Sequence, residues 1–477
     1  MNELAVDVAI IGAGTAGLAA YKAARTHHGK RVLLIEGGPY GTTCARVGCM
    51  PSKLLIAAAE AAHGMRAAPA FGVHPGAVCI DGRAVMARVR SERDRFVDYV
   101  LAGIDRIPDA DRLRGCARFL DTSRLQVDDH TIVHAGSIVI ATGSSPYVPP
   151  ELAPAGARLV VNDDVFEWED LPESVAVAGT GIIGLELGQA LHRLGVRVAL
   201  FGRGGRLAQL ADPAVLAAAT RAFGAELDLR PETERLDVQG DGQQVRIRSR
   251  GAAGERDETY SFLLAATGRV PNVRHLCLER TGLALDTRGL PLFDPYTMQC
   301  CGSNIFIAGD AGNERPLLHE AAGQGRIAGD NAGRYPDVRP GLRHAPLAVV
   351  FTDPQIASVG QGWRSLRPGS FAVGEVSFDN QGRSRVMLQN RGLLRVYGEF
   401  GSGRFLGAEM AAPRAEHLAH LLAWACQSGM TVEQMLHMPY YHPVIEEGVR
   451  SALRDLYENL LRGPQEIEHC TDCTPGM

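Results

Sequence analysis

The chain has 477 residues, of which 45% are hydrophobic and 22% are charged, and its formal net charge is −5. This apolar content excludes a disordered or collagen-like chain, and the length predicts about three domains. Because the charge is slightly negative and no Lys/Arg block occurs, we expect no nucleic-acid partner and no anionic-membrane surface.

The first residues contain no basic segment followed by a cleavable apolar stretch, and no uncharged apolar run is long enough to cross a membrane. We therefore expect a cytoplasmic protein without membrane contact. Ten cysteines in a reducing compartment do not predict a structural disulfide framework. Three close pairs nevertheless stand out, namely Cys44 with Cys49, Cys300 with Cys301 and Cys470 with Cys473. The adjacent cysteines 300 and 301 are expected to be packing residues.

The first predicted unit is a strand, a glycine-rich turn, a helix and a second strand. Residues 6–11 form a nearly continuous apolar run, a helical pattern follows over 18–26, and a second strand is expected over 31–36. Glycines in such a turn let the backbone approach a pyrophosphate, which lies at the positive end of the following helix. The glycines concerned are Gly12, Gly14 and Gly17.

The same pattern returns later in the chain. A strand is predicted over 174–178, a helix over 185–194 and a second strand over 197–202. The glycines of this second turn are Gly179, Gly181 and Gly184. One glycine-rich turn is weak evidence, but two copies in the same strand and helix context predict two dinucleotide-binding domains.

The other predicted elements fall between and after these units. Strands that run into tight turns are expected over 138–143 and 263–269, where the chain crosses between domains, and over 305–310, before a helix over 324–332. From about residue 341 a separate α+β domain is expected, with strands over 345–351 and 392–397 and helices over 415–428, 432–436 and 448–461. The polar segment 240–254 is expected to be a surface hairpin or loop.

The segment 44–53 carries the strongest chemical signal. Helix geometry places residues five apart at roughly 8 to 9 Å between Cα atoms, beyond the roughly 7 Å limit for a disulfide. Cys44 and Cys49 can therefore bond only across a distorted turn, which Gly48 and Pro51 permit. Two thiols without mutual chemistry are the alternative, but the position directly after a dinucleotide-binding unit favours a redox pair.

These motifs together resemble the flavin-dependent pyridine nucleotide-disulfide oxidoreductases, and within that family they are most similar to the dihydrolipoamide dehydrogenases. The matching segments are 12–17, 44–53, 141–143, 179–184, 268–272, 308–310 and 442–447. The resemblance implies an α/β fold with two dinucleotide-binding (Rossmann-like) domains, a central segment and a C-terminal α+β dimerisation domain. It implies FAD and NAD(P)H as cofactors and a homodimer as the assembly.

The implied domain boundaries follow from the same motifs. The first part of the FAD-binding domain is expected over 1–147, the NAD(P)H-binding domain over 148–268, and a central segment that completes the FAD domain over 269–340. The dimerisation domain is expected over 341–462, and a cysteine-containing tail over 463–477.

The resemblance also assigns roles to single residues. Glu36, about 20 residues past the first glycines, is expected to accept the ribose hydroxyls of FAD, and Asp310 matches the aspartate that holds the ribityl chain. Cys49 is implied as the thiolate in charge-transfer contact with the flavin and Cys44 as the interchange thiol. Lys53 and Glu186 resemble the ion pair beside flavin N5. Cofactor binding is also implied for Thr142, Gly143, Gly268, Gly309 and Lys53.

Thiol–disulfide exchange at neutral pH needs a base near the interchange sulfur. His442 and Glu447 match the family's base and its orienting carboxylate, and in the family this histidine comes from the other subunit. Val444 replaces the usual threonine and Glu446 replaces a small residue. These departures leave the base intact and change the residues expected at the substrate entrance.

The expected function is electron exchange between NAD(P)H and a dithiol or disulfide substrate through the cysteine pair 44 and 49. Lipoyl groups, free or on a lipoyl domain, are the leading substrate. Another small or protein disulfide, or a metal ion such as Hg(II), remains an alternative, as does a non-catalytic flavoprotein redox sensor. Mercuric reductases share the cysteine motif and a terminal cysteine pair, but they normally lack the histidine and glutamate. The intact pair at 442 and 447 argues against a redox sensor.

The second unit favours NADPH over NADH. Gly202 occupies the position where the first unit has Glu36, so no carboxylate repels a 2′-phosphate there. Arg203 and Arg206 follow at once, and a guanidinium binds phosphate through paired hydrogen bonds. An ordinary basic surface loop is the alternative.

The tail carries Cys470 and Cys473 after a helix stop signal at 463–464. Nine extended residues can span roughly 30 Å, so the pair can approach a site across a dimer interface. A relay of electrons to bulky disulfides is the leading interpretation. No resident metal ion is predicted, although His469 beside the pair leaves soft-metal handling open, and a tail without a role is the third possibility.

Overall fold

The computed structural model describes residues 1–252 and 254–464. The predictions for Cys470 and Cys473 therefore lie outside the described residues. The fold divides into two compact units. The first unit comprises Met1–Gly179, Leu187–Val198 and Glu234–Arg343, and the second comprises Thr180–Glu186, Ala199–Thr233 and the described residues from His344 onward.

The sheet at the start of the first unit has β1 (Asn2–Ile11) at its centre. Strands β2 (Val32–Glu36) and β6 (Thr131–Ile140) flank β1 in parallel, and β17 (Ile305–Ile307) pairs in parallel with β6. The remaining strands are β3 (Arg112–Arg114), β4 (Ala117–Phe119) and β5 (Arg124–Val127), in the order β3-β2-β1-β6-β5-β4. This is the parallel strand–helix–strand arrangement that the first glycine turn predicted.

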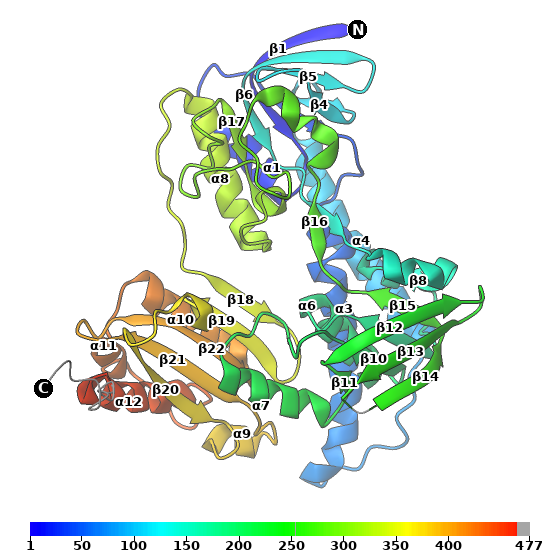
Figure 1. The fold of residues 1–477 in the computed structure, drawn as a ribbon, viewed down its shortest axis with the longest axis vertical. Helices are drawn as coiled ribbons and strands as arrows, with labels where there is room; N and C mark the ends of the chain where they lie inside the picture. The colour runs from blue at the N-terminus through cyan, green and yellow to red at the C-terminus, as the bar shows by residue number, and fades with distance from the viewer. Residues whose placement is uncertain (253, 465–477) are drawn as a thin grey trace, which may run out of the picture. The chain divides into compact units, whose positions relative to one another are not determined.

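Helices α1 (Thr15–Ala24) and α8 (Leu318–Arg334) lie side by side against this sheet (Figure 1). Their close approach depends on small residues. A Cβ at Gly325 would lie 2.2 Å from the carbonyl oxygen of Ala16, and one at Gly329 would lie 2.2 Å from that of Ala20. No side chain fits at either glycine, so this spacing fixes α8 directly on the helix that follows the first glycine loop.

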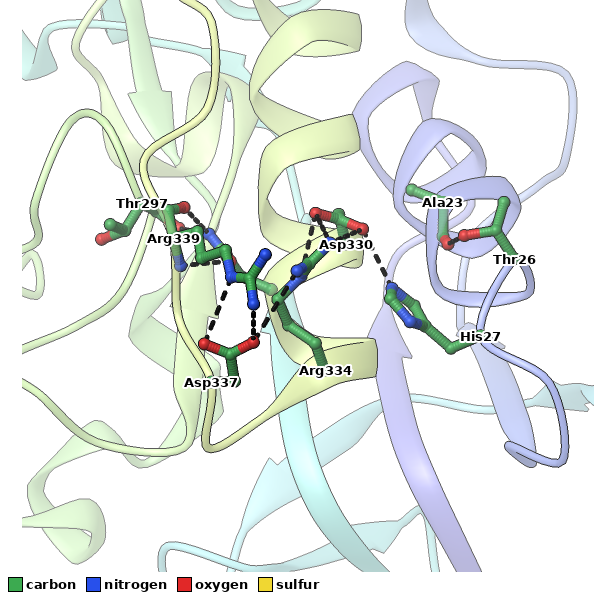
Figure 2. A network of polar contacts seen from close by, with 9 residues as sticks. Ala23, Thr26, His27, Thr297, Asp330, Arg334, Asp337 and Arg339 are labelled. Carbon is green, nitrogen blue, oxygen red and sulfur yellow. Dashed lines mark hydrogen bonds and ion pairs between the residues drawn. The ribbon is translucent and has the colours of Figure 1, made fainter.

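A polar network joins the C-terminal ends of α1 and α8 (Figure 2). The His27 Nε2 atom lies 2.9 Å from Asp330 Oδ1, and the Arg334 guanidinium donates to the same carboxylate. Arg339 pairs with Asp337, and its backbone N–H donates to the side chain of Asn331. Partly exposed pairs of this kind contribute about 0 to 1 kcal/mol each, so close helix packing carries more of the stability here.

The rest of the first unit contains the cysteine helices and part of the second Rossmann-like fold. Helices α2 (Thr43–Val47), α3 (Cys49–Ala67), α4 (Gly82–Asp105) and α5 (Asn162–Val165) belong to it. Strand β9 (Ser174–Ala178) pairs in parallel with β15 (Phe262–Ala265), which pairs with β8 (Leu159–Val160).

Two crossing segments of the first unit lie side by side, as β7 (Ser144–Pro146) pairs antiparallel with β16 (Arg269–Pro271). Strands β12 (Thr233–Gly240), β13 (Val245–Gly251) and β14 (Gly254–Tyr260) form a three-stranded sheet. The described residues of the polar segment, 240–252 and 254, therefore belong to a hairpin, one of the two forms expected for this segment.

In the second unit, β10 (Arg197–Phe201) pairs in parallel with β11 (Asp228–Arg230), and α7 (Pro213–Gly224) lies between them in sequence. Helix α6 (Ile182–Arg193) and β10 each run from one unit into the other. Helix α7 begins with a strong signal, because Asp212 accepts from Ala214 N and Val215 N and Pro213 is its first residue.

The C-terminal part of the second unit is an antiparallel sheet covered by helices (Figure 1). Its order is β18-β19-β22-β21-β20, with bounds Leu347–Val350, Gln355–Gly360, Phe405–Ala412, Leu393–Glu399 and Phe371–Ser377. The helices are α9 (Gly382–Val386), α10 (Ala415–Gln427), α11 (Val432–Leu436) and α12 (Glu447–Arg462). Leu394, Val396, Ala408 and Met410 share a buried cluster with α10 and α12. Alternation along a strand therefore turns Arg395, Tyr397 and Glu409 to the opposite face.

The mixed α/β fold with a C-terminal α+β domain confirms the predicted fold class. Within residues 1–252 and 254–464, no helix combines the length and the apolar character that a membrane crossing requires.

Candidate active site

The first glycine loop divides its work among three glycines. Gly12 has φ 108°, and a Cβ there would lie 2.3 Å from the carbonyl oxygen of Ala141. A Cβ at Gly17 would lie 1.8 Å from the Gly12 oxygen, so only glycine allows the helix to start this close to the strand. Gly14 has no atom within 4 Å of such a Cβ. The unoccupied space beside Gly14 is where a pyrophosphate can approach the backbone.

Glu36 turns its side chain toward this loop from the end of β2. Its Oε2 accepts a hydrogen bond from Ala13 N and its Oε1 accepts one from Gly38 N, each at 2.7 Å. A carboxylate has about four acceptor positions, so two remain for ribose hydroxyls. The buried Oγ1 of Thr142 has no hydrogen-bond partner within the described ranges, which suits a ligand that supplies one.

A chain of hydrogen bonds positions Asp310. Gly309 has φ 70°, and its N–H donates to the buried Gln324 Oε1 at 2.8 Å. Asp310 Oδ2 accepts from Ser144 Oγ at 2.6 Å, and Ser144 Oγ in turn accepts from Arg269 Nε at 2.8 Å. Three motifs far apart in sequence therefore meet here.

Gly143 belongs to the same place, because its carbonyl oxygen accepts from Asn272 N at 2.9 Å. The glycine loop, Glu36, Thr142 and Asp310 together form a donor and acceptor set that fits the pyrophosphate, ribose and ribityl groups of FAD.

The two central cysteines lie on either side of a break between helices. Cys44 lies in α2 and Cys49 is the first residue of α3, and Gly48 between them has φ −123° and ψ −116°. A Cβ at Gly48 would lie 3.0 Å from the carbonyl oxygen of Thr43. Before α2, Thr42 has φ 60°, an unusual conformation for a β-branched residue, and its Oγ1 accepts from Ala45 N. The distorted turn predicted between the cysteines is present.

The two thiols interact with each other. The pKa of Cys44 is raised well above its usual value by a side-chain hydrogen bond to Cys49, by burial and by the charge of Cys49. The backbone N–H of Cys49 and the positive charge of Lys53 oppose this rise without cancelling it. Cys49 begins a 19-residue helix, and a helix N-terminus favours negative charge. The raised pKa keeps the Cys44 thiol protonated, and the helix N-terminus at Cys49 is a place that favours a thiolate.

Lys53 and Glu186 lie in different units, Lys53 on α3 of the first and Glu186 on α6 of the second. The buried Glu186 Oε1 accepts from Phe351 N at 2.9 Å. The predicted ion pair of Lys53 with Glu186 stays a prediction.

The second glycine loop repeats the geometry of the first. Gly179 has φ 121°, and a Cβ there would lie 2.3 Å from the carbonyl oxygen of Ala266. Gly181 again has nothing within 4 Å of such a Cβ, and Gly184 lies in the first turn of α6. This loop therefore offers a second open approach for a pyrophosphate.

The end of β10, which follows the second glycine loop, differs from the end of β2, which follows the first. A Cβ at Gly202 would lie 2.5 Å from Thr180 Oγ1, and this hydroxyl donates to the carbonyl oxygen of Arg206 at 2.6 Å. The side chains of Arg203 and Arg206 are exposed on the loop that follows. Gly202 thus puts no carboxylate where Glu36 stands beside the first glycine loop, and two arginines follow it, while Glu232 Oε1 lies 3.4 Å from a Cβ placed at Gly205.

His442 and Glu447 form a pair in the second unit. The His442 Nδ1 atom lies 3.0 Å from Glu447 Oε1, and Val444 N donates to Glu447 Oε2. Both bonds hold the pKa of Glu447 below its usual range, so this carboxylate is ionised at neutral pH. An ionised carboxylate at Nδ1 selects the tautomer with a proton there, which leaves Nε2 as the basic nitrogen. The imidazole is 80% exposed and accessible to a substrate or a second subunit.

Sequence reasoning missed several residues of the site. Ser144 and Arg269 support Asp310, and Thr180 fills the space beside Gly202. Ser144 directly follows the motif at 141–143, and Thr180 lies within the motif at 179–184, so both have a usable local signal. Within residues 1–252 and 254–464, no group of three or more His, Cys, Asp or Glu side chains can hold a metal ion.

Comparisons with known proteins identify the family and the fold. Residues 6–325 match the model of the pyridine nucleotide-disulphide oxidoreductase family, and residues 347–453 match the dimerisation domain of that family. The mercuric reductase of Acidithiobacillus ferrooxidans is 34% identical over 94% of this chain and 82% of its own length. The dihydrolipoyl dehydrogenase of Bacillus subtilis is 28% identical over 94% of this chain and 98% of its own. The structure of LpdA from Mycobacterium tuberculosis superposes with a TM-score of 0.79 at 25% identity, covering 95% of this chain and 99% of LpdA.

Proposed function

The chain belongs to the pyridine nucleotide-disulphide oxidoreductase family, whose members depend on FAD and NAD(P)H, and we propose that it exchanges electrons between NADPH and a disulfide through Cys44 and Cys49. Lipoyl groups are the leading substrate. The observation that carries the proposal is the pair of His442 and Glu447, since thiol exchange requires a base and soft-metal reduction does not.

The cysteine chemistry follows from the raised pKa of the Cys44 thiol. The Cys44 sulfur must lose its proton before it attacks a substrate disulfide, and Cys49 already carries the first negative charge. Attack forms a Cys44–substrate disulfide and breaks the substrate S–S bond, and the departing sulfur takes up a proton. Cys49 then attacks the Cys44 sulfur, which forms the Cys44–Cys49 disulfide and releases the second substrate thiolate.

His442 supplies both proton transfers in this proposal. Its Nε2 accepts the proton of Cys44 and donates it to the departing substrate sulfur, while Glu447 stabilises the imidazolium formed between the two steps. The dimerisation-domain match supports a homodimer, and we propose that the base of one subunit serves the cysteines of its partner.

FAD, when bound, supplies a two-electron carrier between the nicotinamide and the Cys44–Cys49 disulfide. The residues that would hold it are the glycines 12, 14 and 17, Glu36, Thr142 and Asp310. At the second loop, Arg203 and Arg206 would bind the 2′-phosphate of NADPH, because both are exposed on the loop that follows Gly202 and Gly202 itself carries no carboxylate.

The test uses purified holoenzyme with lipoamide and NADPH or NADH. Replacing His442 with glutamine should lower disulfide turnover by roughly 10²- to 10⁴-fold, the usual effect of a positioned acid–base group. The rate of flavin reduction by the nucleotide should stay within about twofold of the wild-type rate, because His442 takes no part in that step. An equal loss in both half-reactions would assign His442 a structural role and contradict the proposal.

Reduction of Hg(II) is the second candidate, because the mercuric reductase named above is more similar in sequence than the dihydrolipoyl dehydrogenase. In that reaction two electrons from NADPH reduce Hg(II) to Hg(0), and no disulfide is consumed. Hg(II)-dependent NADPH oxidation that survives His442→Gln, together with no turnover of lipoamide, would favour it.

We propose that Cys470 and Cys473 in the tail relay electrons from the central cysteine pair to bulky substrates. Replacing Cys470 and Cys473 with serine should leave reduction of free lipoamide nearly unchanged, since a small disulfide can reach Cys44 directly. Activity on a protein disulfide should collapse. Unchanged rates on bulky substrates would indicate a tail without a role, and loss of a stoichiometrically bound metal would indicate metal handling.

A further inference from the structure

The loop that carries Arg203 and Arg206 is held in an unusual conformation. Gly204 and Gly205 have φ 62° and 68°, and Ala208 has φ 48°. A residue with a side chain in this left-handed region costs conformational energy, so the surroundings must fix it. The loop therefore needs anchors on both sides of its arginines.

The first anchor is the glycine turn itself. Thr180 Oγ1 donates to the carbonyl oxygen of Arg206, and Ala208 N donates to the carbonyl oxygen of Thr180 at 2.8 Å. Gly205 N also donates to Pro231 O at 3.0 Å. These bonds fix the beginning and the middle of the loop to the second Rossmann-like fold.

The second anchor comes from the C-terminal sheet. Glu409 on β22 is only 2% exposed, and its Oε2 accepts from Ala211 N at 2.8 Å and from Asp212 N at 2.9 Å. Its Oε1 accepts from Trp363 N at 2.9 Å. A buried carboxylate is tolerated only when hydrogen bonds replace its water, and here three backbone N–H groups do so. Two of these three belong to the end of the nucleotide loop.

Asp212 strengthens this second anchor. Its carboxylate is fully buried, accepts from Tyr397 Oη at 3.0 Å and lies 3.3 Å from the Arg395 guanidinium. Arg395 on β21 lies directly opposite Glu409 on β22, so two neighbouring side chains of the sheet hold the end of the loop. Burial and the neighbouring carboxylates raise the pKa of Tyr397, which keeps the phenol protonated as a donor.

We infer that Glu409 is a positioning residue for nucleotide choice: its buried carboxylate fixes the end of the 203–212 loop and so holds Arg203 and Arg206 where they bind the 2′-phosphate of NADPH. This inference rests on the proposed use of NADPH. It adds that the determinant of nucleotide choice lies partly in the C-terminal domain, on a residue that touches neither substrate nor cofactor.

The test compares Glu409→Gln with Asp455→Asn in the FAD-loaded enzyme. Glutamine keeps the size of the side chain but turns one acceptor into a donor, which must then face a backbone N–H of Trp363 or of the loop. Asp455 is the matched control, because its carboxylate also accepts a backbone N–H, from Glu375 at 2.8 Å, and does not contact the loop. Tyr397→Phe is a milder second variant that removes one bond to Asp212.

Stopped-flow flavin reduction needs no disulfide substrate and gives the apparent affinity and the limiting rate for each nucleotide. If loosening leaves the binding conformation populated about one tenth of the time, the apparent affinity for NADPH falls about tenfold. The limiting rate and the NADH constants should change less than about twofold, and Tyr397→Phe should shift the same ratio by less. Equal losses with both nucleotides, or no loss in Glu409→Gln, would overturn the inference.

Binding of adenosine 2′,5′-bisphosphate and of 5′-AMP, measured by calorimetry, separates this inference from the proposed function. A wild-type preference for NADH would overturn the NADPH proposal alone. In that event, weaker bisphosphate binding in Glu409→Gln with unchanged 5′-AMP binding still supports the positioning role, and unchanged bisphosphate binding overturns it. A lowered melting temperature shared with Asp455→Asn, without any change in the ratio of the two ligands, also overturns it.

Discussion

The two glycine-rich loops of this chain have the same backbone geometry and opposite chemistry at the end of the second strand. In both, the first glycine has positive φ and a Cβ would lie 2.3 Å from a facing carbonyl oxygen, while the second glycine faces open space. The first loop then meets the carboxylate of Glu36, which accepts from Ala13 N. In the second loop, the side chain of Thr180, which lies between the first two glycines, occupies the space beside Gly202.

This difference shows which part of a dinucleotide site is general and which part is selective. In the proposed function the glycines serve the pyrophosphate, which FAD and both nicotinamide nucleotides contain, so their geometry is repeated. The strand end serves the ribose, where a free hydroxyl pair favours an acceptor and a 2′-phosphate favours cations. In the first loop the small Ala13 leaves room for the Glu36 side chain, and in the second loop the larger Thr180 fills the corresponding space beside Gly202.

The strongest way to break the comparison is to fill the open glycine of each loop. Gly14→Val should abolish FAD retention, and Gly181→Val should leave the protein yellow but abolish flavin reduction by NADPH. In both, a Cβ meets no protein atom within 4 Å, so the added methyl groups obstruct the ligand rather than the chain. The measurements are the flavin absorbance of the purified protein and anaerobic reduction by NADPH and by dithionite.

Gly17→Ala is the control for a packing effect, because its Cβ would lie 1.8 Å from Gly12 O. That variant should lose folded protein as judged by circular dichroism, whereas Gly14→Val should not. Reduction of the Gly181→Val flavin by NADPH at the wild-type rate would show that the second loop does not hold the nucleotide.

Glu36→Ala should have the next largest effect. The carboxylate braces Ala13 N and Gly38 N and is the proposed acceptor for ribose hydroxyls. Hydrogen bonds to charged groups contribute about 1.5 to 3 kcal/mol each. Losing the two bonds proposed between this carboxylate and the ribose hydroxyls should therefore weaken FAD binding by roughly 100-fold or more. Dialysis followed by titration with FAD gives the dissociation constant, and a change below about threefold would remove Glu36 from the ribose site.

Elements whose signals are local in the sequence were predicted well. Strand β9 has the predicted bounds, and α11 does too. Strand β1 begins earlier than the predicted 6–11, since residues 2–6 pair with β6 from a distant part of the chain. Helix α4 was not predicted; only Met86, Val89 and Ile104 of its residues are buried, so its apolar pattern is weak.

The support of the site was harder to predict for a similar reason. Ser144 lies 166 residues from Asp310 in sequence, and Glu409 lies 197 residues from Asp212. Such hydrogen bonds depend on which strands become neighbours, and no short pattern contains that information. The distorted turn between Cys44 and Cys49 could be predicted, because Gly48, which permits it, lies between them in the sequence.

Arg203→Glu should shift nucleotide choice by a smaller factor. Removing one guanidinium and adding a like charge beside a phosphate should lower kcat/KM for NADPH by roughly tenfold, with little change for NADH. Arg454→Glu is the charge-matched control, because Arg454 is exposed on α12 in the same unit. A higher kcat/KM with NADH than with NADPH in the wild type would already contradict the assignment.

The smallest expected effect, and the sharpest test of the comparison, comes from placing the alanine and glutamate of the first loop at the corresponding positions of the second loop. Gly202→Glu alone should destabilise the protein, because its Cβ would lie 2.5 Å from Thr180 Oγ1 and 3.0 Å from Pro231 Cα. Thr180→Ala removes that hydroxyl and reproduces the alanine of the first loop, so the double variant should recover part of the lost melting temperature.

In the double variant the new carboxylate can accept a ribose hydroxyl and repels a 2′-phosphate. The new carboxylate should gain less than Glu36 does, because Pro231 Cα still lies 3.0 Å from its Cβ and displaces the side chain. With a gain of about 0.5 to 1.5 kcal/mol, kcat/KM for NADH should rise about two- to tenfold, and that for NADPH should fall. Thr180→Ala alone is the control, since it loosens the bond to Arg206 O without adding an acid. If the double variant gains no NADH activity over that control, the strand-end residue does not select the ribose, and the difference between the two loops must lie in Arg203 and Arg206 alone.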